Sequence, residues 1–313
     1  MSFATETKNE LARISPEKKC CMLAEIAGFL RVSGSLRLAG GGRFKIVITT
    51  ENPAVARHYK RLIKEYFQVE TELEIGEASG PKKGHAYMLT IDPEMRSEQI
   101  LRETGILLVR EGNNYISDGI YGDIIRSKCC RKAYLRGIFM GAGTVNDPNN
   151  SYHLEIVCAS RNLAGDLKKM INSFVDLSVK ISERKGRFVV YMKNYQYIRD
   201  TLAIMGAHTK VFEFENVQIK KELVNDTVRL TNCDNANTDR TLDASQRHIE
   251  NIRKIQETIG LAALPEKLQV VAILRLENPD ANLVQLGEML DPPMKKSGIN
   301  NRLRKIEEIA NRL

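Results

Sequence analysis

The sequence predicts an α+β protein in which one α-β-β-α-β-β-α unit occurs twice and an all-α domain follows. First, the apolar segment 23–34 returns as segment 135–143. Second, the same order of helical and alternating patterns follows each copy. Third, after about residue 219 the repeat is over, and the patterns that follow a polar joint are helical. A long internal repeat therefore determines the rest of the prediction.

The two repeated segments carry small residues in mid-helix and a glycine at the end. Gly28 returns as Gly137 and Gly34 as Gly143, and the cysteine pair at 20–21 returns at 129–130. Small residues on a helix face let two helix backbones approach closely, and a final glycine suits a left-handed helix end. We therefore expect two motif helices that pack on each other at a pseudo-two-fold axis.

The first half, residues 1–104, surrounds the first motif helix. A short polar helix at 3–13 precedes Ser15-Pro16, which suits the cap and first turn of that helix. Asn52-Pro53 opens a helix between two predicted hairpins. The remaining elements are strands at 35–38 and 43–50, a helix at 53–67, strands at 69–75 and 85–91 joined through residues 78–84, and a helix at 97–104.

The second half, residues 129–218, repeats this order after a connection at 105–128. Asn162 is expected to head the helix equivalent to the one that Asn52 heads. Two such units imply two antiparallel sheets joined through the motif helices. The predicted elements are a strand at 152–159, a helix at 162–174, strands at 177–184 and 187–192, and a helix at 195–205.

The composition is that of an ordinary globular protein. The 313 residues suffice for two or three domains, and 42% are hydrophobic and 27% charged. There is neither a membrane-spanning apolar run nor a signal-peptide pattern, so a cytoplasmic location is expected. The net charge of +8 fits nucleic acid or another anionic surface.

The six cysteines are expected to be free thiols in a reducing compartment. Packing is favoured over metal binding, because neighbouring helical side chains point about 100° apart and make a poor chelate. The five histidines are scattered without ligand spacing. No nucleotide-binding glycine loop, nucleophile elbow or zinc spacing is found. No metal and no cofactor are therefore predicted.

Segments 26–34 and 135–143 resemble the paired motifs of the LAGLIDADG homing endonucleases. In that family the acidic residue before each final glycine is a ligand of divalent metal beside the scissile phosphate. Ser33 and Ala142 stand at these positions, and neither supplies the anionic oxygen that Mg²⁺ prefers. The resemblance implies a saddle of two sheets over DNA, and these two residues imply that it does not cut.

If the saddle binds DNA, its outward strand residues should be basic. We consider auxiliary contacts from Arg37, Arg43, Lys45, Arg184, Lys185, Arg187 and Lys193. Strands with a solvent face carry such residues in any case. Glu70, Glu72 and Glu74 would moreover repel phosphate from the first half. The platform is therefore a weak DNA surface or binds something else.

After the second half the repeat ends, and the C-terminal part of the chain has a different composition. Residues 219–260 are expected to form an Asn-rich polar joint, around 216–241, and then a helix at 243–258. Residues 261–313 are predicted to form helices at 264–276 and 283–290 and a final helix that Ser297 caps. We expect Gly287 to lie where two helices cross. The buried stripe of the last helix is expected to be Ile299, Leu303, Ile306, Ala310 and Leu313.

The start of the final helix concentrates basic and amide side chains. Lys295, Lys296 and Ser297 precede Asn300, Asn301, Arg302, Arg304 and Lys305. This is the layout of a helix-turn-helix, whose recognition helix reads base edges with its early residues. The alternative is a three-helix domain with a solvated basic face. The connection before the last helix is longer than usual for the motif.

A degenerate homing-endonuclease scaffold, an Asn-rich joint and this tail, in that order, resemble the WhiA family of bacterial sporulation and cell-division regulators. The resemblance covers nearly the whole chain. It implies a sequence-specific transcriptional regulator that binds promoter DNA through its tail, without nuclease activity. It leaves open a further regulator or an RNA polymerase sigma factor as partner. The rivals are a metal-dependent endonuclease using Asp123 or Asp147, and a protein-docking scaffold.

Overall fold

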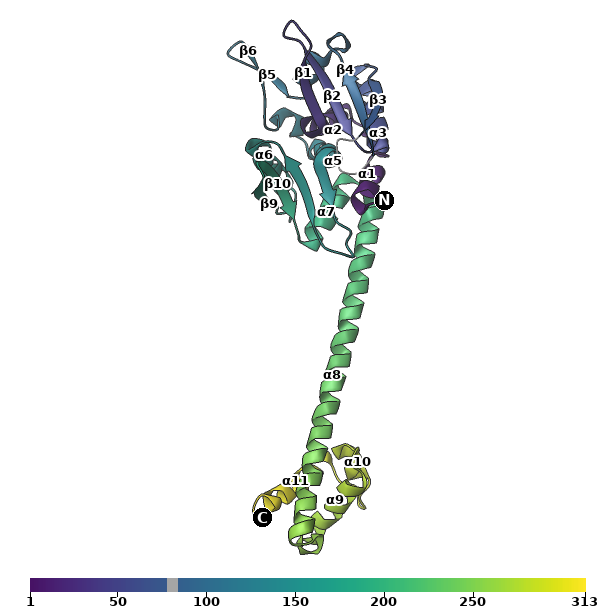
Figure 1. Cartoon of the computed structure of the whole chain (residues 1–313), viewed down its shortest axis with the longest axis vertical. Helices are drawn as coiled ribbons and strands as arrows, with labels where there is room; N and C mark the ends of the chain where they lie inside the picture. Colours follow the sequence, from purple (N-terminus) through teal and green to yellow (C-terminus); the bar gives the residue numbers. More distant parts are fainter. Residues whose placement is uncertain (78–83) are drawn as a thin grey trace. The chain divides into compact units, whose positions relative to one another are not determined.

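The computed structural model describes residues 1–77 and 84–313 (Figure 1). The chain divides into two compact units, Met1–Lys220 and Lys221–Leu313. Within the described residues, no helix combines the length and the apolar character needed to cross a membrane.

The first half of the first unit is a four-stranded antiparallel sheet with helices on one side. The strands lie in the order β1-β2-β4-β3, as the two predicted hairpins require. Of the expected connection at 78–84, residues 78–83 lie outside the described part of the chain. The elements are α1 (Phe3–Leu11), α2 (Lys19–Ser33), β1 (Gly34–Leu38), β2 (Phe44–Thr50), α3 (Pro53–Phe67), β3 (Glu72–Glu77), β4 (His85–Ile91) and α4 (Ser97–Glu103).

The second half repeats this topology. Its strands lie in the order β7-β8-β10-β9, the same pattern of positions as in the first sheet. The predicted two-fold repeat is therefore confirmed. The elements are α5 (Lys128–Ala142), β7 (Gly143–Val145), β8 (Leu154–Cys158), α6 (Arg161–Asn172), β9 (Lys180–Arg184), β10 (Arg187–Met192) and α7 (Tyr195–Met205).

The segment between the halves is structured, which the sequence did not reveal. Strands β5 (Leu107–Arg110) and β6 (Asn113–Ile116) form a hairpin there. The side chain of Arg31, on α2, donates hydrogen bonds to the carbonyls of Ser117 and Gly105. The connection is thereby attached to the first motif helix.

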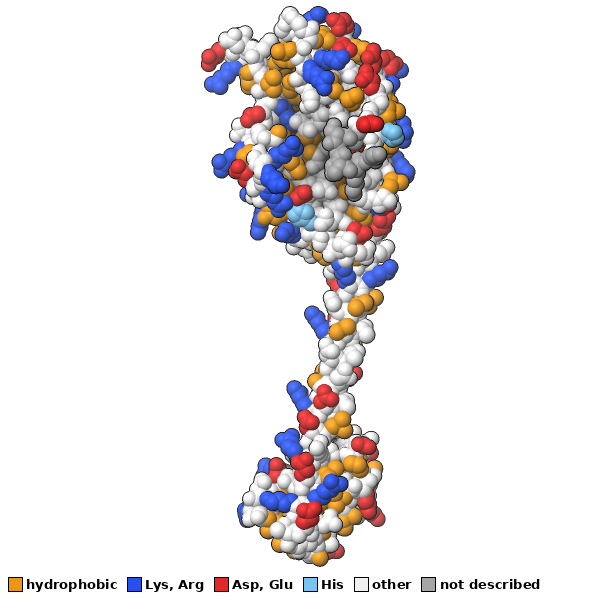
Figure 2. Space-filling view, viewed as in Figure 1, with side chains coloured by type: hydrophobic (Ala, Val, Ile, Leu, Met, Phe, Trp, Pro, Cys, Tyr) orange, Lys and Arg blue, Asp and Glu red, His pale blue; other side chains and the backbone are white. Residues whose placement is uncertain are grey.

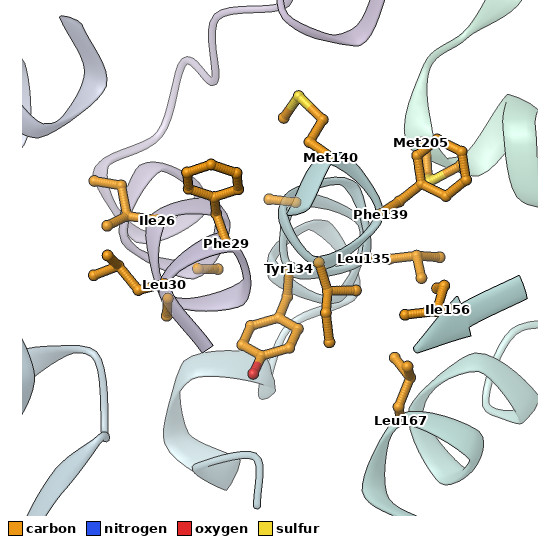
Figure 3. Packing of buried hydrophobic residues seen from close by; sticks show 14 of the residues in the cluster. Ile26, Phe29, Leu30, Tyr134, Leu135, Phe139, Met140, Ile156, Leu167 and Met205 are labelled. Carbon is orange, nitrogen blue, oxygen red and sulfur yellow. The ribbon is translucent and has the colours of Figure 1, made fainter. Parts of the chain in front are cut away.

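The two motif helices α2 and α5 form the centre of the unit. A Cβ added at Gly28 would overlap the carbonyl oxygen of Tyr134, and one added at Gly137 would overlap that of Glu25. Each glycine thus lies against the backbone of the opposite helix, as predicted. Figure 3 shows the two helices side by side, with Phe29 and Tyr134 among the buried side chains around them.

One ion pair crosses this helix interface. Glu25 on α2 is fully buried, and its carboxylate accepts hydrogen bonds from Arg136 Nε at 2.9 Å and Nη2 at 2.5 Å. Its other oxygen lies 2.7 Å from His58 Nε2 on α3. Arg136 also donates to the carbonyl of Met205, at 3.1 Å. The buried charges are therefore paired and hydrogen-bonded, as burial requires.

Three predicted helix ends are wrong. Gly34 and Gly143 have extended backbones with φ of −86° and −85°, so they are not left-handed ends. Glycine is needed there because a Cβ would collide with the preceding turn at Leu30 or Phe139. Helix α2 begins after Lys18 rather than at Ser15-Pro16.

The predicted N-cap of α6, the second-half counterpart of α3, is also wrong. Asn52 caps α3 as expected, through hydrogen bonds from the amides of Ala54 and Val55. In the second half Ser160, rather than Asn162, caps α6 through the amide of Leu163. Both residue types suit a cap, so the sequence alone did not distinguish the two positions.

The predicted polar joint around 216–241 is wrong, because these residues lie inside one continuous helix, α8 (His208–Thr258). It begins in the first unit, and its residues from 221 onward belong to the second. Neither glycine nor proline occurs in it, and the lower helix propensity of Asn and Thr costs only fractions of a kcal/mol per residue. Within the segment expected to be a joint, the hydroxyls of Thr227, Thr231, Thr238 and Thr241 donate to carbonyls four residues earlier.

The rest of the second unit is α9 (Glu266–Glu277), α10 (Leu283–Glu288) and α11 (Lys296–Ala310). The last turns of α8 contribute Ile252 and Ile255 to its core. Asn282 and Gln285 form a capping box at the start of α10. The predicted stripe of α11 is buried from Ile299 to Ala310, but Leu313 lies beyond the helix and is exposed.

Two local predictions in this unit are corrected. Lys295, not Ser297, is the N-cap of α11, and Ser297 is an exposed residue inside the first turn. Gly287 lies against the backbone of the turn rather than at a helix crossing: an added Cβ would overlap the carbonyl of Met294. The Met294 amide donates to the Gly287 carbonyl at 2.8 Å, so this hydrogen bond fixes the turn that leads into α11.

Candidate nucleic-acid interfaces

The N-terminal half of α11 presents the predicted polar and basic side chains to solvent. The packing of Ile299, Leu303 and Ile306 into the core turns the opposite face outward. That face carries amide groups, which can pair with base edges, and cations, which can contact phosphate. Its exposed residues are Lys295, Lys296, Ser297, Asn300, Asn301, Arg304 and Lys305.

The two arginines of α11 already have side-chain partners within the protein. Arg302 is half-buried and donates from Nη1 to the carbonyl of Lys267 on α9, at 3.2 Å. Arg304 forms an exposed ion pair with Glu308, with Nε and Oε1 separated by 3.5 Å. Arg302 thus contributes to packing, and Arg304 is partly neutralised by its own helix.

A groove beside α11 adds basic residues that the sequence analysis did not select. It lies between α8, the start of α10 and the start of α11. It is lined by Lys296, Asn300 and Glu307 of α11, by Arg240, Arg247 and His248 of α8, by Arg275 of α9 and by Asn282 at the start of α10. The seven-residue spacing of Arg240 and Arg247, which places both on one helix face, was the available signal. The signal was missed because Arg240 fell in the expected joint and only Arg247 in the expected helix.

Arg275 is the buried cation beneath this groove. Its side chain donates from Nη1 to Ser245 and to the carbonyls of Asn278, Pro279 and Ala281. Burial lowers its pKa, and no carboxylate is among its partners in the described residues. Burial and then the charge of Arg275 lower the pKa of His248. Among the described residues that line it, the groove therefore has three arginines and Lys296 against one acidic residue, Glu307, even where His248 is neutral.

The open faces of the two sheets differ in charge. On the second sheet Arg184 pairs with Arg187 in the strand register, and Tyr191 pairs with Lys180. Lys193 lies with Nζ 6.0 Å from the Tyr191 ring centre. Lys185 occupies the turn of this hairpin, with φ of +50°. Glu155 lies 3.6 Å from Arg184 and offsets part of the charge.

On the first sheet, basic and acidic residues occupy the same face. Arg37 pairs with Lys45 in register, and Glu72 lies across from Thr90 on that face. Lys45 is 3.0 Å from Asp92, and Arg43 is 3.2 Å from Glu94. Figure 2 shows Lys and Arg gathered over the second sheet, whereas both signs of charge mix over the first. The second sheet is the better phosphate surface.

The ends of the motif helices hold no acidic pair. Ser33 and Ala142 are the last residues of α2 and α5, and Gly141 lies against Ser33 and Val32. Of the alternative acids, Asp123 pairs with Arg126 at 2.7 Å, and Asp147 accepts the Asn149 amide at 2.8 Å in a surface turn. Among the described residues, the only close group of metal-ligand side chains is formed by four cysteines.

The fold and these surfaces define a two-fold LAGLIDADG-like domain followed by a helix-turn-helix domain. The models of three families match: the WhiA N-terminal LAGLIDADG-like domain at residues 19–107, the WhiA LAGLIDADG-like domain at 131–224 and the WhiA C-terminal HTH domain at 227–310. The chain belongs to the WhiA family.

Relatives and a solved structure agree over the full length. The chain is 47% identical over 315 residues to a "probable cell division protein WhiA" of Alkaliphilus oremlandii, covering 100% of this chain and 98% of the relative. It is 44% identical to the protein of that name from Alkaliphilus metalliredigens, with the same coverage. The crystal structure of full-length DUF199/WhiA from Thermatoga maritima is similar with a TM-score of 0.61 and 25% identity, covering 100% of this chain and 99% of that one.

Proposed function

We propose that this protein is a sequence-specific DNA-binding regulator of transcription that reads promoter DNA with α11. The observation that carries the proposal is the exposed amide and lysine face at the start of α11, directly after the tight turn at Gly287 and Met294. Asn300 and Asn301 suit base recognition, and Lys295 and Lys296 suit phosphate. The helix-turn-helix family match supports the same assignment.

The groove between α8, α10 and α11 extends this surface. Arg240 and Arg247 stand beside Lys296, so a phosphate backbone that follows the start of α10 meets three cations. We propose that these arginines add affinity without base selectivity.

The LAGLIDADG-like domain is proposed to bind without cutting. Ser33 and Ala142 lack carboxylates, and neither Asp123 nor Asp147 lies at a motif helix end. Incubation of supercoiled plasmid with the full chain and Mg²⁺ or Mn²⁺ should leave it uncut. Metal-dependent nicking that co-purifies with the protein would establish the nuclease instead.

The decisive measurement is binding of the full chain to promoter fragments from a genome-wide selection, followed by fluorescence anisotropy. Asn300→Ala should lower the preference for the selected site over random DNA by about 1–3 kcal/mol. Lys296→Ala should weaken binding to both and reduce the salt slope by about one unit. Arg312→Ala, just beyond the far end of α11, is the matched control. Equal affinity of all three variants for the selected site would refute the proposal.

The first sheet supports a second function, docking of a protein partner such as another regulator or a sigma factor. Its open face carries Glu72 and Glu74 and a paired Lys45, which disfavours phosphate. Glu72→Lys with Glu74→Lys should then impair regulation in cells without lowering DNA affinity. A loss of DNA affinity in that variant would argue for direct DNA contact.

A further inference from the structure

Four cysteines meet where the two motif helices begin. Cys20 and Cys21 lie in the first turn of α2, and Cys129 and Cys130 lie in the first turn of α5. Their four Sγ atoms all lie within 4.8 Å of one another. The expectation of simple packing fits Cys21 and Cys130, which are buried, but not Cys20, which is exposed.

We propose that these four thiols are the ligands of a single tetrahedral metal ion of the zinc class. Four sulfurs at the Zn–S length of about 2.3 Å are about 3.8 Å apart, so only a small closure of the observed group is needed. An iron–sulfur cluster carries its cysteines on the corners of a cube and needs them further apart. All four residues are free cysteines in the structure, with no disulfide among them.

The surroundings suit an anionic tetrathiolate. Zinc with four thiolates has a net charge of −2, and binding releases the thiol protons to solvent. The first turns of both helices bring the positive ends of two helix dipoles to the sulfurs. Lys18 and Lys132 line the surface cavity beside Cys21 and Cys129, and this cavity gives an ion a way in.

This site is distinct from the position that holds metal in the endonucleases. Thirteen residues separate Cys20 from Ser33 on α2, or about 20 Å of helix. An ion at the cysteines would therefore tie the N-terminal ends of α2 and α5 together, far from the emptied positions Ser33 and Ala142. Its role is to join the two halves of the repeat rather than to act on a substrate.

The test is metal analysis of the full chain purified without chelators, with cobalt substitution. One zinc ion per chain is expected, together with the thiolate-to-cobalt charge-transfer bands and the intense visible bands of tetrahedral cobalt. Cys20→Ser with Cys129→Ser should lose zinc and both sets of bands. Cys233→Ser, at an exposed cysteine on α8, should keep them.

Several results would overturn the assignment: four titratable thiols with no zinc and no cobalt bands, bound iron and sulfide, or a disulfide under reducing conditions. Zinc that persists in the double variant would do so as well. If the double variant does not fold, cobalt titration of the metal-free wild-type chain still decides the question.

Discussion

Gly28 and Gly137 are the residues at which the two halves of the repeat come closest. Each lies under a backbone carbonyl of the opposite helix, so no side chain can replace the hydrogen there without separating the helices. A backbone obstacle cannot rotate away as a side chain can. These two positions are therefore highly sensitive to small additions of volume.

Gly28→Ala is expected to destabilise the first unit by about 1–3 kcal/mol, the usual cost of overpacking. Gly165→Ala on α6 is the control, since an added Cβ there has no neighbour within 4 Å. It should be neutral or gain up to about 1 kcal/mol of helix propensity. All 10 tyrosines lie in this unit, so urea unfolding followed by tyrosine signal measures it alone. Equal midpoints for the two variants would contradict the close approach.

His248 makes the second unit sensitive to acid. Its pKa is lowered from 6.5 by burial and by Arg275, with Glu307 opposing and Arg247 assisting. The unfolded chain takes up a proton near pH 6.5 that the folded chain does not, so stability falls as the pH drops below about 6.5. Hydrogen exchange of the α9 and α11 amides should accelerate at pH 5.5 relative to its intrinsic rate. His248→Gln should flatten that dependence.

Helix α8 shows that a segment rich in Asn, Asp and Thr can still be helical. Its residues 222–243 are all exposed, so local helix propensity and the backbone hydrogen bonds of the helix maintain it there. The predicted joint is wrong because Asn, Asp and Thr disfavour a helix only weakly when no Gly or Pro accompanies them.

Asn235→Pro should break α8 locally at a cost of about 3 kcal/mol. Helical ellipticity should fall while the tyrosine unfolding midpoint of the first unit stays unchanged. Asn235→Ala is the control and should raise ellipticity slightly. A proline variant with unchanged ellipticity and unchanged amide protection would mean that this segment is not helical in solution.

Periodicity predicted most of the elements because burial imposes it. Helix α3, the strands of both sheets except β7, and the apolar stripe of α11 up to Ala310 follow from alternating or 3.6-residue patterns and were found near the expected positions. The β5–β6 hairpin was missed because its residues are largely exposed and carry little pattern. The cysteine cluster was missed because each pair was judged as a chelate on its own, whereas the packing of the two motif helices brings the two pairs together.

At the scale of the whole molecule, two surfaces are available for nucleic acid. Arg184→Ala with Arg187→Ala on the second sheet should weaken binding of the full chain to all DNA sequences alike. The salt slope should fall by about one unit for each phosphate that the variant no longer neutralises. Anisotropy titrations on selected and random duplexes at two salt concentrations measure this. Lys168→Ala with Lys169→Ala, on α6 of the same half, controls for net charge. A variant with unaltered affinity would restrict binding to the helix-turn-helix domain.

The ion pair between Glu25 and Arg136 makes the duplicated chain self-selective. Arg136 precedes Gly137, whereas Ala27 precedes the matching Gly28. Two first halves brought together would each set a desolvated carboxylate against a methyl group, and two second halves would leave two guanidinium groups without an acid. Only unlike halves neutralise each other. Each half is therefore electrostatically complementary to the other half and not to a copy of itself, and the connection between them keeps the matching half in the same chain.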